Sequence, residues 1–449
     1  AVSQRAVVVS APTEKDVDQW TSQKAYGGTE STQLAVGTAT RYRHMFTPPG
    51  ERCAALDASL VEAAAKIRDS FTDKDVEPCA IGTATQTPAL FCGRVCLDAL
   101  DGRLNKSSVC LEGERSEGGF RVPLDLTAVE GSYALFPGQV IGVVGSAPGE
   151  DGTILARSII LGSPAPPAST PAKQMQEYHT KQQNNQPLSI WAASGPYTTS
   201  DDLDYSPLKD LLAACRQAKP DAVVLLGPFV DADHPLAKNN DLKEGDESVD
   251  AATLFVLKVA WALEKLVIEE DCPTQFILAP ATRDLVAEPV FPQPPLDAPP
   301  LGTVNDARPS WQDEMPVGSL ELPSQVHVVG NPGLFKINEV VVGVTATDVL
   351  FQLSSQELFH NGRDNSDIAK MPRVARLASH LLSQRSFYPL FPPPSMSSTV
   401  ADAPVDLRQH GKWKLPLQPD VLITPSKLQP FARDVQGCLV LNPGHLSKG

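Results

Sequence analysis

The sequence is poor in aromatic residues, in histidine and in positive charge. Aromatic residues make up 6% of the 449 residues, and there are 8 histidines. Against 38 Lys and Arg stand 53 Asp and Glu, so the formal net charge is −15. A field of this sign repels phosphate backbones and anionic lipid surfaces. The composition therefore argues against strong binding of nucleic acid, or of a membrane surface, by this chain alone.

Paired cysteines and long uncharged apolar runs are also missing. The 8 cysteines form no C-x-x-C pair, which indicates core thiols in a reducing compartment. The most apolar helical stretch, 252–268, contains lysines and a glutamate, and the N-terminus does not resemble a signal peptide. We therefore expect a chain that neither crosses a membrane nor is secreted. Because it begins at Ala1 and not at a methionine, we expect a fragment.

Hydrophobic residues make up 42% of the chain, enough for the cores of two or three domains. Residues 1–40 mix Gly, Ser, Thr and Gln without apolar periodicity, so we expect a flexible lead-in. In the following segment, 41–78, apolar residues recur at helical spacing: Leu60, Ala64, Ile67 and Phe71. This spacing predicts a helix over 57–71 that packs on the domains.

Five short apolar or alternating runs between turn residues fill 79–162, which predicts a small Greek-key barrel of the oligonucleotide/oligosaccharide-binding (OB) type. Single-strand binding by such a barrel needs aromatic platforms and a basic groove. The barrel offers few aromatics among acidic neighbours: Phe91, Phe120, Tyr133 and Phe136. A scaffold barrel is therefore favoured over a DNA-binding one. The Pro-, Ser- and Gln-rich stretch 163–187 is typical of a linker.

Strands and helices alternate from residue 188 to 449, which predicts an α/β domain with helices flanking a mixed sheet. A hairpin is expected to turn at Asn338 and Glu339. Ligands gather at the carboxyl ends of strands in such sheets. Four of these ends carry notable residues: Gly195, Pro196 and Tyr197; Gly227, Pro228 and Asp231; Thr282, Arg283 and Asp284; and His445.

This order of strand ends resembles the calcineurin-type metallophosphoesterase family, whose pattern is D-x-H, G-D-x-x-D, G-N-H-[DE], a lone H and G-H-x-H. That family needs about six or seven ligands to hold two divalent cations. Here Pro228 stands where the bridging aspartate belongs, Arg283 adds positive charge, and His445 alone is kept from the last motif. The resemblance implies an inactive phosphoesterase-like domain without metal or cofactor. A weak single-metal site at Asp231, Asp284 and His445 stays open.

A barrel of this type before a degenerate phosphoesterase domain resembles the B subunits of eukaryotic replicative DNA polymerases. The stretches GPYTTSDDLDYSPLKDLL, LGPFVDADHP, RDLVAEPVFPQPP, LSQRSFYPLFPPP and NPGHLSKG favour the polymerase alpha group over polymerase delta or epsilon. The resemblance covers most of residues 79–449. It implies a non-catalytic nuclear scaffold in the initiation of DNA replication. Such a scaffold binds the zinc-bearing C-terminal domain of the polymerase alpha catalytic subunit, and meets primase indirectly.

Four aromatic residues on proline-rich segments are candidate partner-binding residues: Phe291, Phe387, Tyr388 and Phe391. Proline stiffens these segments and lowers the ordering cost of binding, and buried aromatics dominate many interfaces. The alternative is that they seal the core of the α/β domain. Two other functions also stay open: an active phosphoesterase with an unusual metal site, and single-stranded DNA binding through the barrel.

Overall fold

The computed structural model describes residues 6, 8–9, 44–99, 102–296, 322–362, 366–394 and 404–448. Most of the expected flexible lead-in, 1–40, lies outside these ranges. Two of its residues form strand β1 (Val8–Val9), which pairs antiparallel with β14 (Gly333–Ile337) and is therefore not a loose tether at this point. In the part of the chain that is described, no helix is long and apolar enough to cross a membrane.

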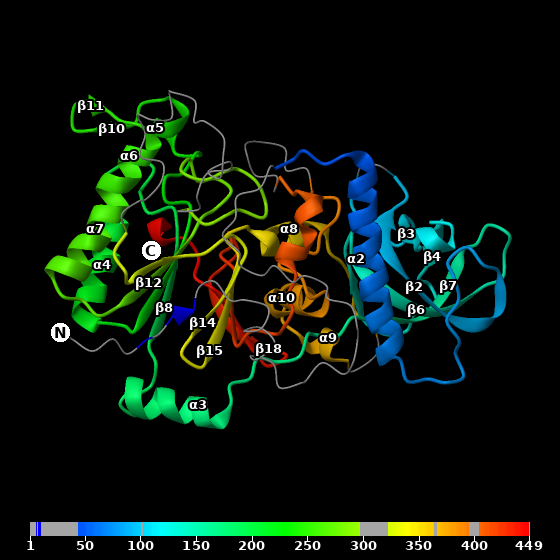
Figure 1. The fold of residues 1–449 in the computed structure, drawn as a ribbon. Helices are drawn as coiled ribbons and strands as arrows, with labels where there is room; N and C mark the ends of the chain where they lie inside the picture. The colour runs from blue at the N-terminus through cyan, green and yellow to red at the C-terminus, as the bar shows by residue number, and fades with distance from the viewer. Residues whose placement is uncertain are drawn as a thin grey trace, which may run out of the picture.

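The predicted helix is present as α2 (Pro49–Ser70) and begins earlier than expected, with a proline in its first turn. Proline suits this place because the first amides of a helix have no intrahelical partner. Leu60, Ala64 and Ile67 form its buried face, as their spacing predicted. They pack on barrel residues Leu90, Cys92 and Val140. Figure 1 shows α2 between the barrel and the rest of the molecule.

The five strands expected in the segment 79–162 close into a barrel in the order β2-β3-β4-β7-β6. β2 pairs antiparallel with both β3 and β6, and β4 pairs parallel with β7. This order fits an OB-type Greek-key barrel. The strands are β2 (Thr85–Leu97), β3 (Val109–Glu112), β4 (Arg121–Asp125), β6 (Val140–Ala147) and β7 (Ile154–Leu161).

Two sheets that pack face to face form the larger part of the chain, where we expected a mixed sheet. One is parallel, in the order β13-β12-β9-β8, and the other is mixed, in the order β1-β14-β15-β17-β19-β18. Val224 and Ile277 of the first meet Phe335 and Val342 of the second in one core. The pattern of apolar residues along a strand shows which of its faces are buried. It does not show which strands are neighbours in a sheet.

The strands of the parallel sheet are β8 (Ile190–Ser194), β9 (Ala222–Leu226), β12 (Gln275–Ala279) and β13 (Val326–Val328). Those of the mixed sheet, besides β1 and β14, are β15 (Val340–Val344), β17 (Val421–Ile423), β18 (Phe431–Val435) and β19 (Cys438–Asn442). The hairpin from β14 to β15 turns at Asn338 and Glu339, as predicted.

Helices cover the outer face of each sheet, which gives four layers in the order helix, sheet, sheet, helix (Figure 1). α4 (Ser206–Ala218) and the helical rod 251–269, which contains α6 (Ala251–Phe255) and α7 (Trp261–Glu264), pack on the parallel sheet. α8 (Val349–Gln356) and α10 (Arg373–Ser383) pack on the mixed sheet. Shorter elements are α5 (Pro235–Lys238), α9 (Asp367–Lys370), β10 (Lys243–Glu244) and β11 (Glu247–Ser248).

The segment expected to be a linker, 163–187, contains helix α3 (Ala172–Glu177) and is fastened to the sheet. Glu339, in the turn between β14 and β15, holds it at several points. The Glu339 carboxylate lies 3.0 Å from His179 Nε2 and accepts a hydrogen bond from Gln183 at 2.8 Å, while the Glu339 carbonyl accepts one from Thr170. Side-chain hydrogen bonds therefore hold in place a stretch that its composition predicted to be a linker.

The barrel and the two-sheet domain meet through a strand pair that the sequence did not indicate. β5 (Tyr133–Leu135) pairs antiparallel with β16 (Leu358–His360). Beside it, the Gln384 amide accepts a hydrogen bond from Val140 N at 2.8 Å and donates one to Val140 O at 3.0 Å, as a neighbouring strand would. Both links use the main chain of the barrel, so they fix its orientation.

A buried ionic cluster lies directly behind β16. Glu357 accepts two hydrogen bonds from Arg376, each 2.9 Å long, and its Oε1 lies 3.0 Å from His380 Nε2. The side chains of Glu357 and Arg376 are 3% and 7% exposed. The Arg376 guanidinium also stacks 3.7 Å from the ring centroid of Phe359 in β16. Removing one member of such a buried pair leaves the other uncompensated.

We therefore expect Glu357→Gln to lower the free energy of unfolding by roughly 3–5 kcal/mol, measured by urea unfolding at neutral pH. Burial opposes ionisation of Glu357, but hydrogen bonds from His380 and Arg376 outweigh it and lower its pKa from 4.5 to about 2. A lowered pKa means that this contribution is complete above pH 4.5 and is lost as the pH falls towards 2. The difference between variant and wild type should shrink over that interval.

The exposed Glu264 of α7 supplies the matched control. Glu264→Gln should change the unfolding free energy by no more than about 0.5 kcal/mol. Equal effects of the two substitutions, or a Glu357→Gln effect that does not depend on pH, would contradict the role assigned to the cluster.

Candidate functional site

The carboxyl ends of both sheets converge, and the residues there contact one another. Gly195, after β8, lies so close to the Pro228 carbonyl, after β9, that a Cβ at Gly195 would clash with it. His445, after β19 of the other sheet, lies with Nδ1 2.8 Å from the Gly195 carbonyl oxygen and donates to it. Three of the strand ends marked in the sequence are therefore brought together.

Asp284 is the centre of this arrangement and is 3% exposed. One carboxylate oxygen accepts hydrogen bonds from the backbone amides of Phe229 and Val230, and the other accepts one from Ala281 at 2.9 Å. Burial raises the pKa of Asp284 to about 7, although the three amides favour the charged form. The Gly227 Cα faces the same carboxylate, and a Cβ there would clash with it. Asp284 thus binds the loop after β9 to the loop after β12.

Asp231 and Arg283 face each other beside this centre. Arg283 Nη2 lies 3.5 Å from Asp231 Oδ2, and Nη1 lies 3.0 Å from Asp233 Oδ2. Burial raises the pKa of Asp231, and the Arg283 charge partly offsets that rise. Thr282 is half-buried in the same turn. The guanidinium therefore occupies the acidic surroundings that a cation would otherwise enter.

Aromatic side chains fill the space behind the strand ends. Tyr197 is 1% exposed and donates its hydroxyl to the Leu226 carbonyl at 3.0 Å. Its ring stacks on Phe229 with 5.3 Å between centroids. Tyr205 donates to the Phe229 carbonyl at 2.9 Å. Burial raises the pKa of Tyr197 well above its ordinary value, so it is a neutral donor. Pro196, between Gly195 and Tyr197, joins the strand end to this aromatic cluster.

Two buried asparagines with structural roles at this end of the molecule were missed in the sequence. Asn331 accepts hydrogen bonds from Thr345 and Ala346 and donates to Gln293 at 2.8 Å. Asn442 accepts from the amides of Ser426 and Gly444. Each begins an Asn-Pro-Gly triplet just after a buried apolar run. That repeated triplet is the signal that could have identified them.

Three of the four candidate partner-binding aromatics lie in the core behind the mixed sheet. Phe291, Phe387 and Tyr388 are 0–3% exposed, and Phe291 packs 5.5 Å from Tyr388 and 5.6 Å from Trp413 between ring centroids. Their burial corrects the prediction that they are surface anchors and matches the alternative that they seal the core. Phe391 alone is half-buried, and it lines a groove beside α2.

The barrel aromatics are also mostly internal. Phe91, Tyr133 and Phe136 are 0–1% exposed, whereas Phe120 is 55% exposed. Stacking of single-stranded bases needs several exposed aromatic faces along a basic path. Only one of these four rings presents such a face.

The fold and its strand ends together define a class of protein: a closed β-barrel joined rigidly to two stacked sheets, with strand-end polar groups bonded to one another. Among the described residues, no three His, Cys, Asp or Glu side chains are placed to hold a metal ion. Comparison with known proteins agrees with this class. The family described as the B subunit of DNA polymerase alpha/epsilon matches residues 190–433, and the OB domain of the DNA polymerase alpha B subunit matches 54–161.

Curated relatives extend this match over most of the chain. The chain is 33% identical to the DNA polymerase alpha B subunit of Schizosaccharomyces pombe over 418 residues, 92% of this chain and 66% of the relative. It is 30% identical to that of Rattus norvegicus over 441 residues, 96% and 65% of the two chains. It is 27% identical to that of Saccharomyces cerevisiae over 387 residues, 78% and 50%. The chain belongs to the family of B subunits of DNA polymerase alpha/epsilon, as the resemblance to replicative polymerase B subunits implied, and the relatives named here are alpha B subunits. It spans about two thirds or less of these relatives' length.

The geometry at Asp284 gives a prediction for stability. Asp284→Asn places an amide NH₂ opposite a backbone N–H donor, so one buried donor loses its acceptor. We expect the free energy of unfolding to fall by roughly 1–3 kcal/mol, measured in urea near neutral pH. Asp210→Asn, on the exposed face of α4, is the control and should have little effect. Equal stability of the Asp284→Asn variant and wild type would show that the three amides do not depend on this carboxylate.

Proposed function

We propose that the chain is the non-catalytic accessory and scaffold subunit of a DNA polymerase alpha–primase complex. In this role it binds the zinc-bearing C-terminal domain of the catalytic subunit, contacts primase indirectly, and acts in the nucleus when DNA replication begins. The observation that carries the proposal is the match of residues 190–433 to the B subunit of DNA polymerase alpha/epsilon and of residues 54–161 to the OB domain of the alpha B subunit. The state of Asp284 supports a non-catalytic role, because its buried carboxylate accepts three backbone hydrogen bonds and thereby joins two loops.

The stack of helix, sheet, sheet and helix supports a calcineurin-like phosphoesterase ancestry for the larger domain. A pair of divalent cations does not fit the residues at its strand ends. Pro228 has no side-chain ligand atom, His445 Nδ1 is engaged with Gly195, and Arg283 lies against Asp231. Two metal ions beside a guanidinium would repel it, since each adds two positive charges. We therefore propose that this domain keeps the fold without the hydrolytic reaction.

A scaffold needs surfaces whose relative position does not change when a partner binds. The β5–β16 pair, the Gln384 bridge to Val140 and the buried Glu357 cluster supply that rigidity between barrel and two-sheet domain. A partner can thus contact both parts without having to order them. We propose the following division of the chain: lead-in, 1–40; helical segment, 41–78; barrel, 79–162; linker, 163–187; and phosphoesterase-like domain, 188–449.

Co-expression with the C-terminal domain of a polymerase alpha catalytic subunit tests the scaffold role. We expect one peak of a one-to-one complex by size-exclusion chromatography with mass determination in moderate salt. The corresponding domain of the polymerase epsilon catalytic subunit is the control and should elute separately. Two separate peaks with the alpha domain, while the chain shows a cooperative unfolding transition, would exclude the proposed partner.

Hydrolysis of bis-p-nitrophenyl phosphate in the presence of manganese tests the absence of catalysis. The rate with the purified chain should equal that of the buffer, because the strand ends offer no cation site. Asp231→Asn and His445→Ala should leave that rate unchanged. A manganese-dependent rate that both substitutions abolish would instead establish an active phosphoesterase.

A further inference from the structure

A groove follows α2 where this helix, the barrel and the two-sheet domain meet. Its larger cavity, of about 460 Å³, lies between α2, the barrel and the segments 383–391 and 405–416. A second cavity of about 280 Å³ continues it over the barrel. The two share Leu56, Arg94 and Phe391, so they form one elongated depression, called here the junction groove. Cavities of these sizes hold small ligands or a few residues of a peptide.

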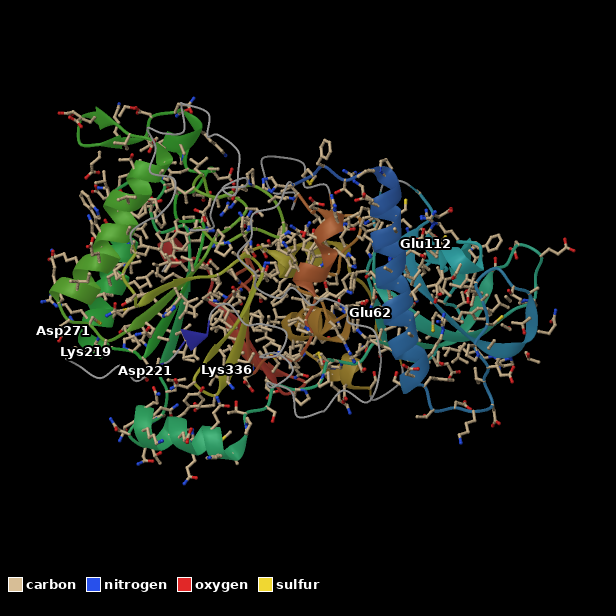
Figure 2. The ribbon with its side chains drawn as sticks, viewed as in Figure 1. Glu62, Glu112, Lys219, Asp221, Asp271 and Lys336 are labelled. Carbon is tan, nitrogen blue, oxygen red and sulfur yellow. The ribbon has the colours of Figure 1, made fainter. Side chains whose placement is uncertain are left out.

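Positive charge gathers in the larger cavity although the whole chain is acidic. Lys66 and Lys414 both contact one carboxylate, Glu62, which Figure 2 labels on α2. Arg385 lies beside them and donates its hydrogen bonds to neutral oxygens, the carbonyls of Ser163 and Pro164 among them. Three cations therefore share one acidic partner at this point, which leaves a local excess of positive charge.

The protonation behaviour of these groups agrees with that excess. Burial opposes ionisation of Glu62, but hydrogen bonds from Lys414 and Lys66 outweigh it and lower its pKa to about 2. Burial lowers the pKa of Lys66, the hydrogen bond and charge of Glu62 partly offset that fall, and the charges of Arg385 and Lys414 add to it. A further carboxylate in the cavity would relieve this repulsion.

The wall of the groove is apolar and aromatic. Phe391 lines the cavity from the two-sheet domain and Ala63 lines it from α2, and both are half-buried, while Tyr388, Trp413 and Ile67 lie deeper in the wall and are 2–7% exposed. Phe391 is the half-buried ring among these aromatics, and it is common to both cavities. A fitting ligand therefore combines carboxylates with apolar side chains and is longer than a single ion. An extended peptide has this combination.

We propose that the junction groove binds an extended acidic peptide segment of a partner protein, with carboxylates at Lys66, Arg385 and Lys414 and an apolar side chain against Phe391. This inference goes beyond the scaffold function and does not depend on it.

Single-stranded nucleic acid is the less suitable anion. A polyphosphate carries charge at every unit and is subject to the field of the whole chain, which is −15. Asp57, Glu62 and Glu112 also line the groove and would face its phosphates. A short peptide with a few carboxylates can instead place them at the three cations and keep neutral residues opposite the acids.

Fluorescence anisotropy with the purified chain tests the proposal. The probes are labelled peptides of equal length with the same leucine and alanine residues. Their other positions are glutamine or glutamate, and the share of glutamate rises from none to half of all residues. We expect affinity to rise with glutamate content and to fall with salt. Lys66→Gln combined with Lys414→Gln should weaken binding of the most acidic peptide by roughly tenfold or more. Lys209→Glu with Lys265→Glu, at exposed positions on other helices, should not.

Glu62→Gln should change the affinity for the acidic peptide in the opposite direction. A variant that had lost its fold could not bind more tightly. It removes the competing carboxylate, so the acidic peptide should bind several-fold more tightly. Affinity that is independent of glutamate content, or a Glu62→Gln variant that binds no more tightly, would overturn the proposal. Stronger binding of oligothymidine than of the acidic peptide would also overturn it, in favour of a nucleic-acid groove. Complex formation with the catalytic subunit is measured separately, so each proposal can fail alone.

Discussion

The barrel is joined to the two-sheet domain by hydrogen bonds that use the main chain of the barrel. The Val140 peptide group exchanges both of its hydrogen bonds with the Gln384 amide, and Phe391 N donates to the Pro137 carbonyl at 3.0 Å. Gly138 lies between them with φ of +95°, and a Cβ there would clash with the Phe391 backbone. A positive φ and close backbone approach are both conditions that glycine meets without strain. The orientation of the barrel follows from this contact.

The same contact explains why the aromatic segments are internal. Phe136 of the barrel belongs to the core behind the mixed sheet and packs edge-on against His380, 4.8 Å between ring centroids. Phe291 and Phe387, from the proline-rich stretches, belong to the same core. A proline-rich segment need not be a surface spacer when its aromatic side chains can be removed from water, since each buries a large apolar area.

Local spacing was sufficient to predict the regular elements. Leu60, Ala64 and Ile67 identify the buried face of α2 without any knowledge of its partner, and the five barrel runs could be recognised one by one. β5 could not, because it has only three residues, and its partner β16 lies more than two hundred positions away. Pairing over such a separation is decided by the packing of the finished domains and not by nearby residues.

The strand-end site shows a different limit of prediction from the sequence. Pro228 in place of an acid is visible in the sequence, but the role of Asp284 depends on three backbone amides that come together only when β9 and β12 lie side by side.

The junction groove follows from the way the parts are joined. α2 packs on barrel residues such as Leu90 through its apolar face, so its other side is left towards the two-sheet domain. Lys414, on that domain, reaches Glu62 of α2 across the gap. A gap closed by charged side chains instead of apolar ones is penetrable, because these side chains are only part-buried, at 24% and 39% exposed, and ion pairs that solvent reaches can exchange partners. The rigid hydrogen-bonded contact between barrel and two-sheet domain therefore lies beside an adaptable, charged surface on α2. A rigid contact beside an adaptable surface suits the proposed scaffold, which must keep its shape while partners bind and dissociate.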